Sequence, residues 1–369
     1  MKNSSYEIKL FCDRYIFIKQ NNGGIKTYFK NILNKIDKKI IARNYINDRD
    51  DKNLFNSFFE ILKSYFEPLY KNLLQRKNSK NVYHGSYYLN PLLPLYKFPK
   101  VITIHDMIPE LFPTHLEKSS EKALNLIRRA RKFSIDNCDQ IITPSLTTKN
   151  DLLSIYPYLK RERVSVIHHG IDHFSNKNVY PEIVDEYLDK EFLLYVGSRA
   201  HYKGFFDLVK AYAVVVKEYP NLKLICAGIK FNRNEMIFFR ENNIDTSKII
   251  NVQPNNNQLK FLYCSSSAFI YPSLYEGFGF PPLEAIISGA KSVICSSIPS
   301  TKEICMEYVE YYPAGDVDSL VSFIFKALLY RKSIDSEIQK IILKKYSWQK
   351  SAKKHLELYY ELCNNCVVQ

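Results

Sequence analysis

The sequence lacks the segments that carry a chain into or across a membrane. It has no run of about 18 or more apolar residues, so no membrane-spanning helix is expected. Its start, Met1–Lys9, is polar and lacks the apolar core of a signal peptide. The eight cysteines are scattered, and the terminal pair Cys363 and Cys366 has no second pair to complete a zinc site. These features favour a cytoplasmic location with reduced thiols.

Two motifs of cofactor and metal chemistry are also missing. No Gly-x-Gly-x-x-Gly fingerprint occurs, which disfavours a nicotinamide-dependent dehydrogenase. The histidines at predicted strand ends, His84, His105, His168 and His169, have neither His-x-His nor i, i+4 spacing among them, and we expect no metal site. Two Asp-x-Asp triplets are present, but Arg49 would oppose a cation between Asp48 and Asp50. The second triplet, Asp316–Asp318, is better interpreted as a helix cap.

Positively charged residues outnumber negatively charged ones. The 369 residues include 52 Lys and Arg against 38 Asp and Glu, giving a formal net charge of +14. A basic surface attracts anions, which include nucleic acids, phosphate-bearing substrates and acidic membrane faces. The length suits two domains, each large enough to bury its own core.

Short apolar runs alternate with longer amphipathic stretches, which predicts strands covered on both faces and connected by helices. We expect strands at Glu7–Phe11, Val82–His84, Val101–Ile104, Gln140–Thr143, Val164–Ile167, Phe192–Val196, Leu222–Ala227, Ile249–Val252, Ala268–Tyr271, Ser292–Cys295 and Tyr311–Tyr312. The polar segment between the two series, Gly170 to Glu191, is interpreted as a linker. The fold class is therefore α/β, with two doubly wound parallel-sheet domains at 1–172 and 173–346 and a terminal helix in 347–369.

Two amphipathic stretches of the first domain allow two interpretations. Phe55–Leu74 is rich in aromatic residues at helical spacing, and Ala123–Phe133 carries four basic residues along its polar side. Both could be core-facing helices with solvated outer faces. One of them could instead lie on an anionic membrane surface.

The most specific motif is the segment Glu276-Gly-Phe-Gly-Phe-Pro-Pro-Leu-Glu284, which follows a predicted strand. Gly277 and Gly279 allow the backbone to approach a ligand closely, and the two prolines suit a helix start. A helix N-terminus below a glycine turn favours an anion. Glu276 could hold hydroxyls of a sugar and Glu284 those of a ribose. The alternative is an ordinary strand–turn–helix with two surface glutamates.

A second motif, Val196-Gly-Ser-Arg-Ala-His-Tyr-Lys-Gly204, also follows a strand and precedes a helical stretch. Arg199 and Lys203 could neutralise a diphosphate, because fixed cations stabilise a leaving group that gains negative charge. The alternative is that they are two solvated cations.

In the first domain, Gly23 and Gly24 follow the first strand, where they form a phosphate- or sugar-binding loop or a plain turn. His105 ends another strand, at the edge where active sites of open α/β sheets gather. It could bind a donor sugar hydroxyl or be a satisfied core histidine.

Together these motifs resemble the retaining glycosyltransferases of family 4. The Glu-x7-Glu pair matches Glu276 and Glu284, and the cations that hold the donor diphosphate match Arg199 and Lys203. Many members have Gly-Arg-Leu where this chain has Gly197-Ser-Arg199, so Lys203 is the better match of the two cations. The segment His105–Glu110 resembles mannosyl- and related hexosyltransferases of bacterial surface polysaccharides.

The resemblance implies a GT-B fold, in which two Rossmann-like domains face each other across a cleft, and a terminal helix that crosses back to the first domain. It implies metal-independent transfer of a hexose from a GDP- or UDP-linked donor to a glycan or lipid-linked oligosaccharide acceptor, with no nucleic-acid partner and with peripheral contact to the inner membrane face. Donor contacts would come from Gly23, Gly24, Gly277, Phe278, Gly279 and Glu284, and catalytic contributions from His105, Arg199, Lys203 and Glu276.

Two other functions are compatible with these residues. A nucleotide-sugar epimerase of the same fold would convert the donor without an acceptor. A non-enzymatic polyanion- or membrane-binding protein would use the +14 charge alone, and it gives no reason for the Glu276–Glu284 motif.

Overall fold

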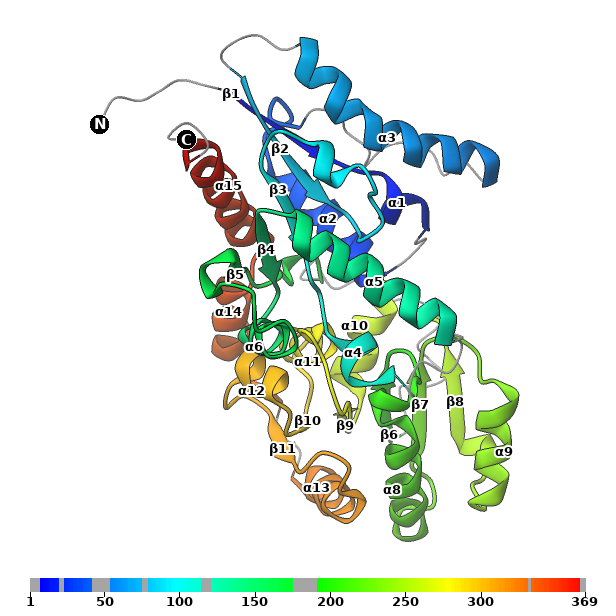
Figure 1. Cartoon of the computed structure of the whole chain (residues 1–369). Coiled ribbons are helices and arrows are strands. Elements are labelled where there is room, and N and C mark those ends of the chain that lie inside the picture. Colours follow the sequence, from blue (N-terminus) through cyan, green and yellow to red (C-terminus); the bar gives the residue numbers. More distant parts are fainter. Residues whose placement is uncertain are drawn as a thin grey trace. The chain divides into compact units, whose positions relative to one another are not determined.

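The computed structural model describes residues 7–19, 23–41, 54–74, 79–113, 121–174, 191–330 and 333–365 (Figure 1). The chain divides into two compact units. Unit 1 contains Met1–Glu110, Ser119–Gly170 and Ser347–Gln369, and unit 2 contains Leu111–Lys118 and Ile171–Tyr346. The expected first domain, 1–172, included the stretch Leu111–Lys118, which clusters with unit 2 instead. The Asp48–Asp50 triplet, Cys366 and most of the expected linker lie outside the described residues.

Unit 1 is built on a five-stranded parallel sheet in the order β1-β2-β3-β4-β5. Its strands are β1 Glu7–Cys12, β2 Ser79–Gly85, β3 Lys100–Thr103, β4 Gln140–Thr143 and β5 Val164–Val166. Its helices and turns are α1 Tyr15–Lys19, α2 Gly24–Lys35, α3 Leu54–Leu74, η1 Leu93–Leu95, α4 Ile108–Leu111 (whose last residue belongs to unit 2), α5 Glu121–Asn137, α6 Leu146–Ile155, η3 Arg161–Arg163 and α15 Trp348–Asn365.

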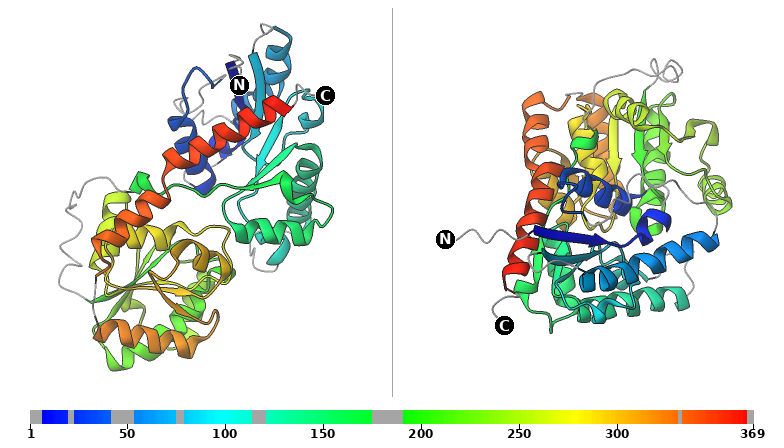
Figure 2. Two further views of the ribbon diagram at one scale, coloured as in Figure 1. Left: turned by 90° about the vertical axis from the view of Figure 1, so that its left-hand side faces the viewer. Right: turned by 90° about the horizontal axis from the view of Figure 1, so that it is seen from above.

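Helices cover both faces of this sheet. The C-terminal helix α15 packs against α2 and β2, whereas α5 packs against β3 and η1. Figures 1 and 2 show α3 and α5 on the face of the sheet opposite α2. The chain leaves α2 for Ile41, which forms a parallel bridge with Leu10 of β1, and then passes through α3 to β2. The connection through α2 therefore runs in the opposite direction along the sheet from those through α3 and α5, and right-handed crossovers then place the helices on opposite faces.

Unit 2 is built on a six-stranded parallel sheet in the order β11-β10-β9-β6-β7-β8. Its strands are β6 Phe192–Val196, β7 Lys223–Ala227, β8 Ile249–Val252, β9 Ala268–Tyr271, β10 Val293–Ser296 and β11 Glu310–Tyr312. Its helices and turns are η4 Asp172–Phe174, η6 His201–Lys203, α8 Phe205–Glu218, α9 Arg233–Glu241, η7 Thr246–Lys248, α10 Asn256–Ser265, α11 Phe280–Ile287, α12 Pro299–Cys305, α13 Val317–Leu329 and α14 Ser336–Lys345.

The apolar strands of unit 2 divide their side chains between two cores. Leu194 of β6 and Phe269 of β9 point into a core with α10, α11, α12 and α14. Leu193 of β6 and Ile270 of β9 point into a second core with α8, α9 and α13. Burial on both faces explains why these strands are continuous apolar runs in the sequence. All eleven expected strands are present, and the expectation of two doubly wound parallel-sheet units is confirmed.

The strand order of unit 2 reverses between β6 and β9, which are neighbours although they are far apart in the sequence. Chain leaving β6 runs toward β7, and chain leaving β9 runs toward β10. The loops therefore diverge at this point, and ligands of open α/β sheets bind in the resulting crevice at the strands' carboxyl ends. Both of the motifs singled out in unit 2 begin here.

Candidate functional site

Two loops meet at the switch point of unit 2. The first follows β6 and ends at Gly204, where α8 begins, and the second follows β9 and ends at Gly279, where α11 begins. They are joined by a hydrogen bond from the backbone N–H of Leu274 to the carbonyl of Tyr202, at 2.7 Å. The two motifs, which are about 70 residues apart in the sequence, thus form one local structure.

Gly204 makes this close approach possible. Its φ is 65°, in the left-handed region, and a Cβ placed on it would lie 2.0 Å from the carbonyl oxygen of Pro272. No other residue type fits without displacing one of the loops, since glycine alone has neither a Cβ nor a penalty for this conformation.

The loop contact brings together the predicted catalytic residues Lys203 and Glu276. The Lys203 ammonium lies 2.6 Å from a carboxylate oxygen of Glu276, and the two side chains are 18% and 9% exposed. Tyr271 at the end of β9 also hydrogen-bonds to Glu276. A cation and a carboxylate with limited access to water therefore sit at the carboxyl edge of the sheet, where a ligand could exchange partners with both.

The N-terminus of α11 follows Glu276 closely in the chain. Gly279, the N-cap, has a φ of 97° and makes no side-chain cap, and Pro281 and Pro282 occupy the first turn. Helix N-termini of this kind carry a partial positive charge and bind anions. Gly277 is buried within the same turn. This segment has the geometry that the sequence motif predicted.

Phe278 is predicted to contact the donor, and that role stays a prediction. Its side chain is buried and packs on Phe280 and Tyr346, with ring centroids 5.4 and 5.8 Å apart. The ring belongs to the core of unit 2. Because the ring is buried in the core, only the backbone of Phe278 could contact a donor.

Glu284 lies one turn inside α11. One of its carboxylate oxygens accepts a hydrogen bond from the hydroxyl of Tyr263, at 3.0 Å. Burial raises the pKa of Glu284 to about 7, and the Tyr263 hydrogen bond counteracts part of that rise. This carboxyl group therefore changes its charge near neutral pH, unlike an ordinary surface glutamate.

Arg199 is held in the loop that follows β6 by partners on the segment leading into α9. Its Nε lies 2.6 Å from Glu235, one Nη donates to the carbonyls of Ile229 and Lys230 at 2.8 and 2.9 Å, and its side chain is 2% exposed. The guanidinium also lies 4.7 Å from the centre of the Phe231 ring. These partners tie the β6 loop to the start of α9, whereas the other Nη is buried without a hydrogen-bond partner in the described residues. Neutralisation of a diphosphate by Arg199 stays a prediction.

The site residues predicted in unit 1 are His105, Gly23 and Gly24. His105 follows β3, and its Nε2 is buried without a hydrogen-bond partner in the described structure. Burial, with a contribution from Arg131, lowers the pKa of His105 to about 3, so the ring is neutral at physiological pH. Gly23 is the N-cap of α2, and a Cβ on Gly24 would have nothing within 4 Å. The surface above Gly24 is therefore open.

The comparisons with known proteins agree with this arrangement. The sequence profile described as Glycosyltransferase Family 4 matches residues 37–173, and the profile described as Glycosyl transferases group 1 matches residues 176–354. The chain belongs to the family 4 glycosyltransferases.

Two curated relatives are described as O-antigen chain mannosyltransferases. The O-antigen chain mannosyltransferase RfbU of Salmonella typhimurium is 27% identical over 61% of this chain and 60% of its own length. The O-antigen chain mannosyltransferase B of Escherichia coli is 26% identical over 67% of this chain and 65% of its own length. The alignments thus span about three fifths of these relatives.

Solved structures support the GT-B fold of the family. Anabaena HepE in complex with UDP-glucose has a TM-score of 0.70 at 15% identity, covering 96% of this chain and 100% of that one. Sucrose-phosphate synthase from Thermosynechococcus elongatus has a TM-score of 0.66 at 18% identity, covering 98% of this chain and 96% of that one.

Two groups of interacting residues in this chain were not predicted from the sequence. Glu235, the partner of Arg199, was not singled out, although Asn232 and Glu235 form the capping box of α9, a pattern readable in the sequence. In unit 1 a buried network was also missed. It joins the Tyr28 hydroxyl to His355 at 2.6 Å and to Thr103 at 2.9 Å, and continues to His84 and Tyr359. No local pattern marks such a network, because its members come from four elements.

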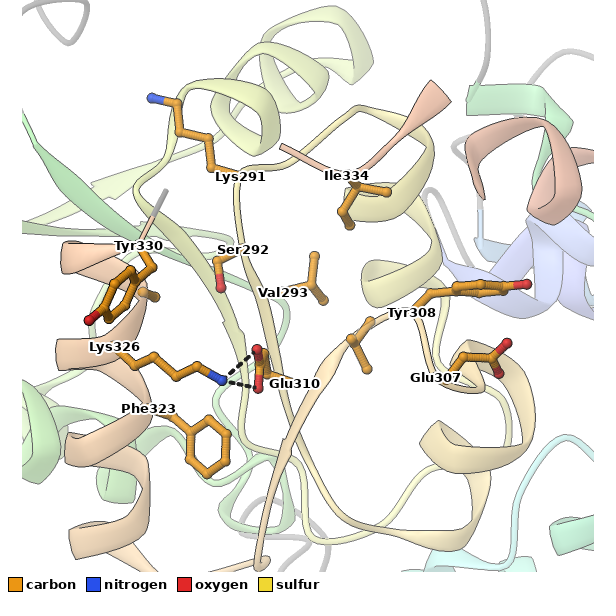
Figure 3. A pocket seen from close by; sticks show the side chains of 12 residues that line it. Lys291, Ser292, Val293, Glu307, Tyr308, Glu310, Phe323, Lys326, Tyr330 and Ile334 are labelled. Atoms are coloured by element: carbon orange, nitrogen blue, oxygen red, sulfur yellow. Dashed lines mark hydrogen bonds and ion pairs between the residues drawn. The ribbon is translucent and has the colours of Figure 1, made fainter. Parts of the chain in front are cut away.

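A cavity of about 340 Å³ lies at the other edge of the unit 2 sheet (Figure 3). It is lined by residues at the amino ends of β10 and β11 and by α13, including the ion pair of Lys326 and Glu310 at 2.9 Å. It contains none of the predicted site residues. Within the described residues, no helix is long and apolar enough to cross a bilayer, and no cluster of three or more His, Cys, Asp or Glu side chains is arranged to hold a metal ion.

Proposed function

We propose that this chain is a retaining hexosyltransferase that moves a mannose-like sugar from a nucleoside-diphosphate donor to a glycan acceptor in surface-polysaccharide synthesis. The observation that carries the proposal is the Lys203–Glu276 pair at the switch point of unit 2, beside the N-terminus of α11. The mannose and the polysaccharide come from the O-antigen mannosyltransferases to which the chain is similar.

The donor diphosphate would bind Lys203 at the positive end of the α11 dipole. Negative charge builds up on the diphosphate as its bond to the sugar breaks, and a fixed cation stabilises that charge. Binding would draw the ammonium away from Glu276, which lies 2.6 Å from it. The freed carboxylate would then accept hydrogen bonds from sugar hydroxyls.

Glu284 would hold the ribose of the nucleotide, because a carboxylate can accept hydrogen bonds from two neighbouring hydroxyls. The contributions of His105, Gly23 and Gly24 stay predictions of the sequence. A lipid-linked oligosaccharide acceptor at the inner membrane face, and a GDP or UDP base on the donor, also belong to this proposal.

Nucleotide affinity should depend on pH through Glu284. Its pKa is raised to about 7, so the carboxyl group is mostly protonated below that pH and a poorer acceptor for ribose hydroxyls. We expect the Kd of UDP or GDP, measured by isothermal titration calorimetry, to rise as the pH falls below 7, approaching about tenfold per pH unit.

The Glu284→Gln variant is the matched control, because it keeps the shape and loses the titration. The nucleotide's own phosphate ionisation would appear equally in both proteins. Identical pH profiles for the two proteins would reject the role of Glu284, and absence of nucleotide binding by the wild type at every pH would reject the proposed function itself.

A further inference from the structure

Tyr28 of α2 is completely buried in unit 1, and histidines surround its ring. The ring centre lies between 4.8 and 6.4 Å from the centres of four imidazole rings, those of His84, His105, His169 and His355. These histidines belong to β2, to the loop after β3, to the segment after β5 and to α15. Tyr28 therefore contacts four separate segments of the unit.

The structure fixes the direction of the hydrogen bond between Tyr28 and His355. Nδ1 of His355 lies 2.7 Å from the carbonyl oxygen of Ser351, and because a carbonyl only accepts, this nitrogen carries a proton. Burial lowers the pKa of His355 to about 4, so the ring is neutral and its Nε2 accepts. The Tyr28 hydroxyl, 2.6 Å away, must therefore donate to His355.

The remaining hydrogen bonds of this network follow from the first. A tyrosine hydroxyl has one proton, so Thr103, at 2.9 Å, must donate to Tyr28. Thr103 has no second proton and accepts from Nε2 of His84 at 2.8 Å. Burial holds the pKa of His84 well below its usual value, so its Nδ1 accepts from the Tyr359 hydroxyl at 2.7 Å. Each proton between Tyr359 and His355 thus has a single place, and a satisfied network of this kind specifies one arrangement.

This network holds the segment that carries the predicted site residue His105. Thr103 is the last residue of β3, two residues before His105, and both contact Tyr28, the first through its hydroxyl and the second through its ring. Nε2 of His105 is buried without a hydrogen-bond partner among the described residues. No bond at this atom fixes the imidazole, so packing against Tyr28, with ring centres 5.0 Å apart and planes at 84°, has to do so.

We propose that Tyr28 is a positioning residue for His105. The hydrogen bonds to Thr103 and His355 hold the Tyr28 ring in one place, and the ring in turn holds the imidazole of His105. The inference deepens the proposed function and rests on it, because the predicted task of His105 is to bind the donor sugar. Tyr28 acts through His105, and a displacement of about 1 Å in a group that binds substrate can cost about 10²-fold in rate.

Imidazole NMR of the full chain tests the network without any substrate. We expect opposite tautomers, with the proton on Nδ1 in His355 and on Nε2 in His84. Single histidine-to-glutamine variants assign the signals. In Tyr28→Phe, which keeps the ring and loses the hydroxyl, the His105 signal should shift or broaden. The same tautomer at both histidines, or an unchanged His105 signal in Tyr28→Phe, would overturn the proposal.

Turnover of the nucleotide-sugar donor separates positioning from a purely structural role. Tyr28→Phe should lower kcat by about tenfold to a hundredfold and leave the Kd of the nucleotide unchanged. The matched control is Tyr96→Phe, which also deletes a buried hydroxyl of unit 1 with two hydrogen bonds, one to Tyr65 and one from Asn90. It should keep its turnover at a comparable urea midpoint.

Two substitutions at Thr103 test the same link from its other end. Thr103→Val should lose turnover as Tyr28→Phe does, and Thr103→Ser, which keeps the hydroxyl, should restore most of it. Normal turnover of Tyr28→Phe, or equal losses in Tyr28→Phe and Tyr96→Phe, would contradict the positioning role. If the wild type binds no nucleotide, the proposed function fails, and the NMR signals alone decide whether Tyr28 places His105.

Discussion

Replacing Lys203 by alanine should lower the turnover of the nucleotide-sugar donor by about 10²- to 10³-fold, the cost of removing one fixed group that stabilises charge in a transition state. The effect should fall mainly on kcat, because the charge on the diphosphate is largest when the bond to the sugar is breaking. Release of nucleoside diphosphate, followed with saturating donor and acceptor, measures it.

Lys203→Ala also leaves Glu276 without its ion pair, so folding must be checked by the urea midpoint of each variant. Lys203→Ala/Glu276→Gln removes that unpaired charge and should be no more active than Lys203→Ala. Lys210→Ala is the matched control, because Lys210 is an exposed lysine of the following helix, α8, and its removal should leave turnover unchanged. Turnover of Lys203→Ala within a few-fold of wild type would contradict the assignment.

Gly204→Ala should be one of the most damaging single-methyl changes in unit 2. The residue has a φ of 65°, which costs a non-glycine residue about 1–2 kcal/mol. The added methyl would also lie 2.0 Å from the Pro272 carbonyl oxygen, so the two loops must separate. We expect a loss of at least about 2 kcal/mol in the free energy of unfolding, together with weakened nucleotide binding.

Gly315→Ala separates the two causes of this loss. Gly315 also has a positive φ, 81°, but the nearest atom to an added Cβ is 3.9 Å away. It should therefore show the conformational cost alone, about 1–2 kcal/mol, with nucleotide affinity intact. Urea unfolding of the three proteins gives the comparison. If Gly204→Ala were no more destabilising than Gly315→Ala, the close contact between the loops would not be what requires glycine there.

The sheets and the central motif were predictable because both depend on local patterns. Strands buried on two faces are continuous apolar runs, and every expected strand is present. The turn at Gly277–Gly279 and the helix start at Pro281 follow from backbone preferences of single residues. Asp316 caps α13 as expected, accepting a hydrogen bond from the backbone of Ser319 at 3.0 Å.

The surroundings of several predicted site residues depend on partners that are distant in the sequence. Whether Arg199 is free or buried depends on Glu235, which is 36 residues away and reaches it only after α9 is packed. Phe278 lies between two glycines in a loop, but its ring enters the core beside Tyr346. In the same way, the low pKa of His105 results from burial that no single motif specifies.

Arg131 is a further example of such a distant partner. Its buried guanidinium donates to the carbonyl of Asp106 at 3.0 Å and pairs with Glu110, and it lies 4.9 Å from the centre of the Tyr88 ring. It thereby fixes the loop that carries His105 after β3. In the sequence it was one of several basic residues on the polar side of a helix, where solvated cations are expected.

The most direct test of the account is a thermal-shift panel with UDP, GDP, dTDP, CMP and ADP, each with and without EDTA. A nucleotide at about 100 times its Kd should stabilise the protein by about 2.7 kcal/mol, which is a shift of several degrees. We predict stabilisation by one nucleoside diphosphate, unchanged by EDTA and reduced in Lys203→Ala. No shift with any nucleotide, or a shift that EDTA abolishes, would contradict a donor site built from Lys203, Glu276 and the start of α11.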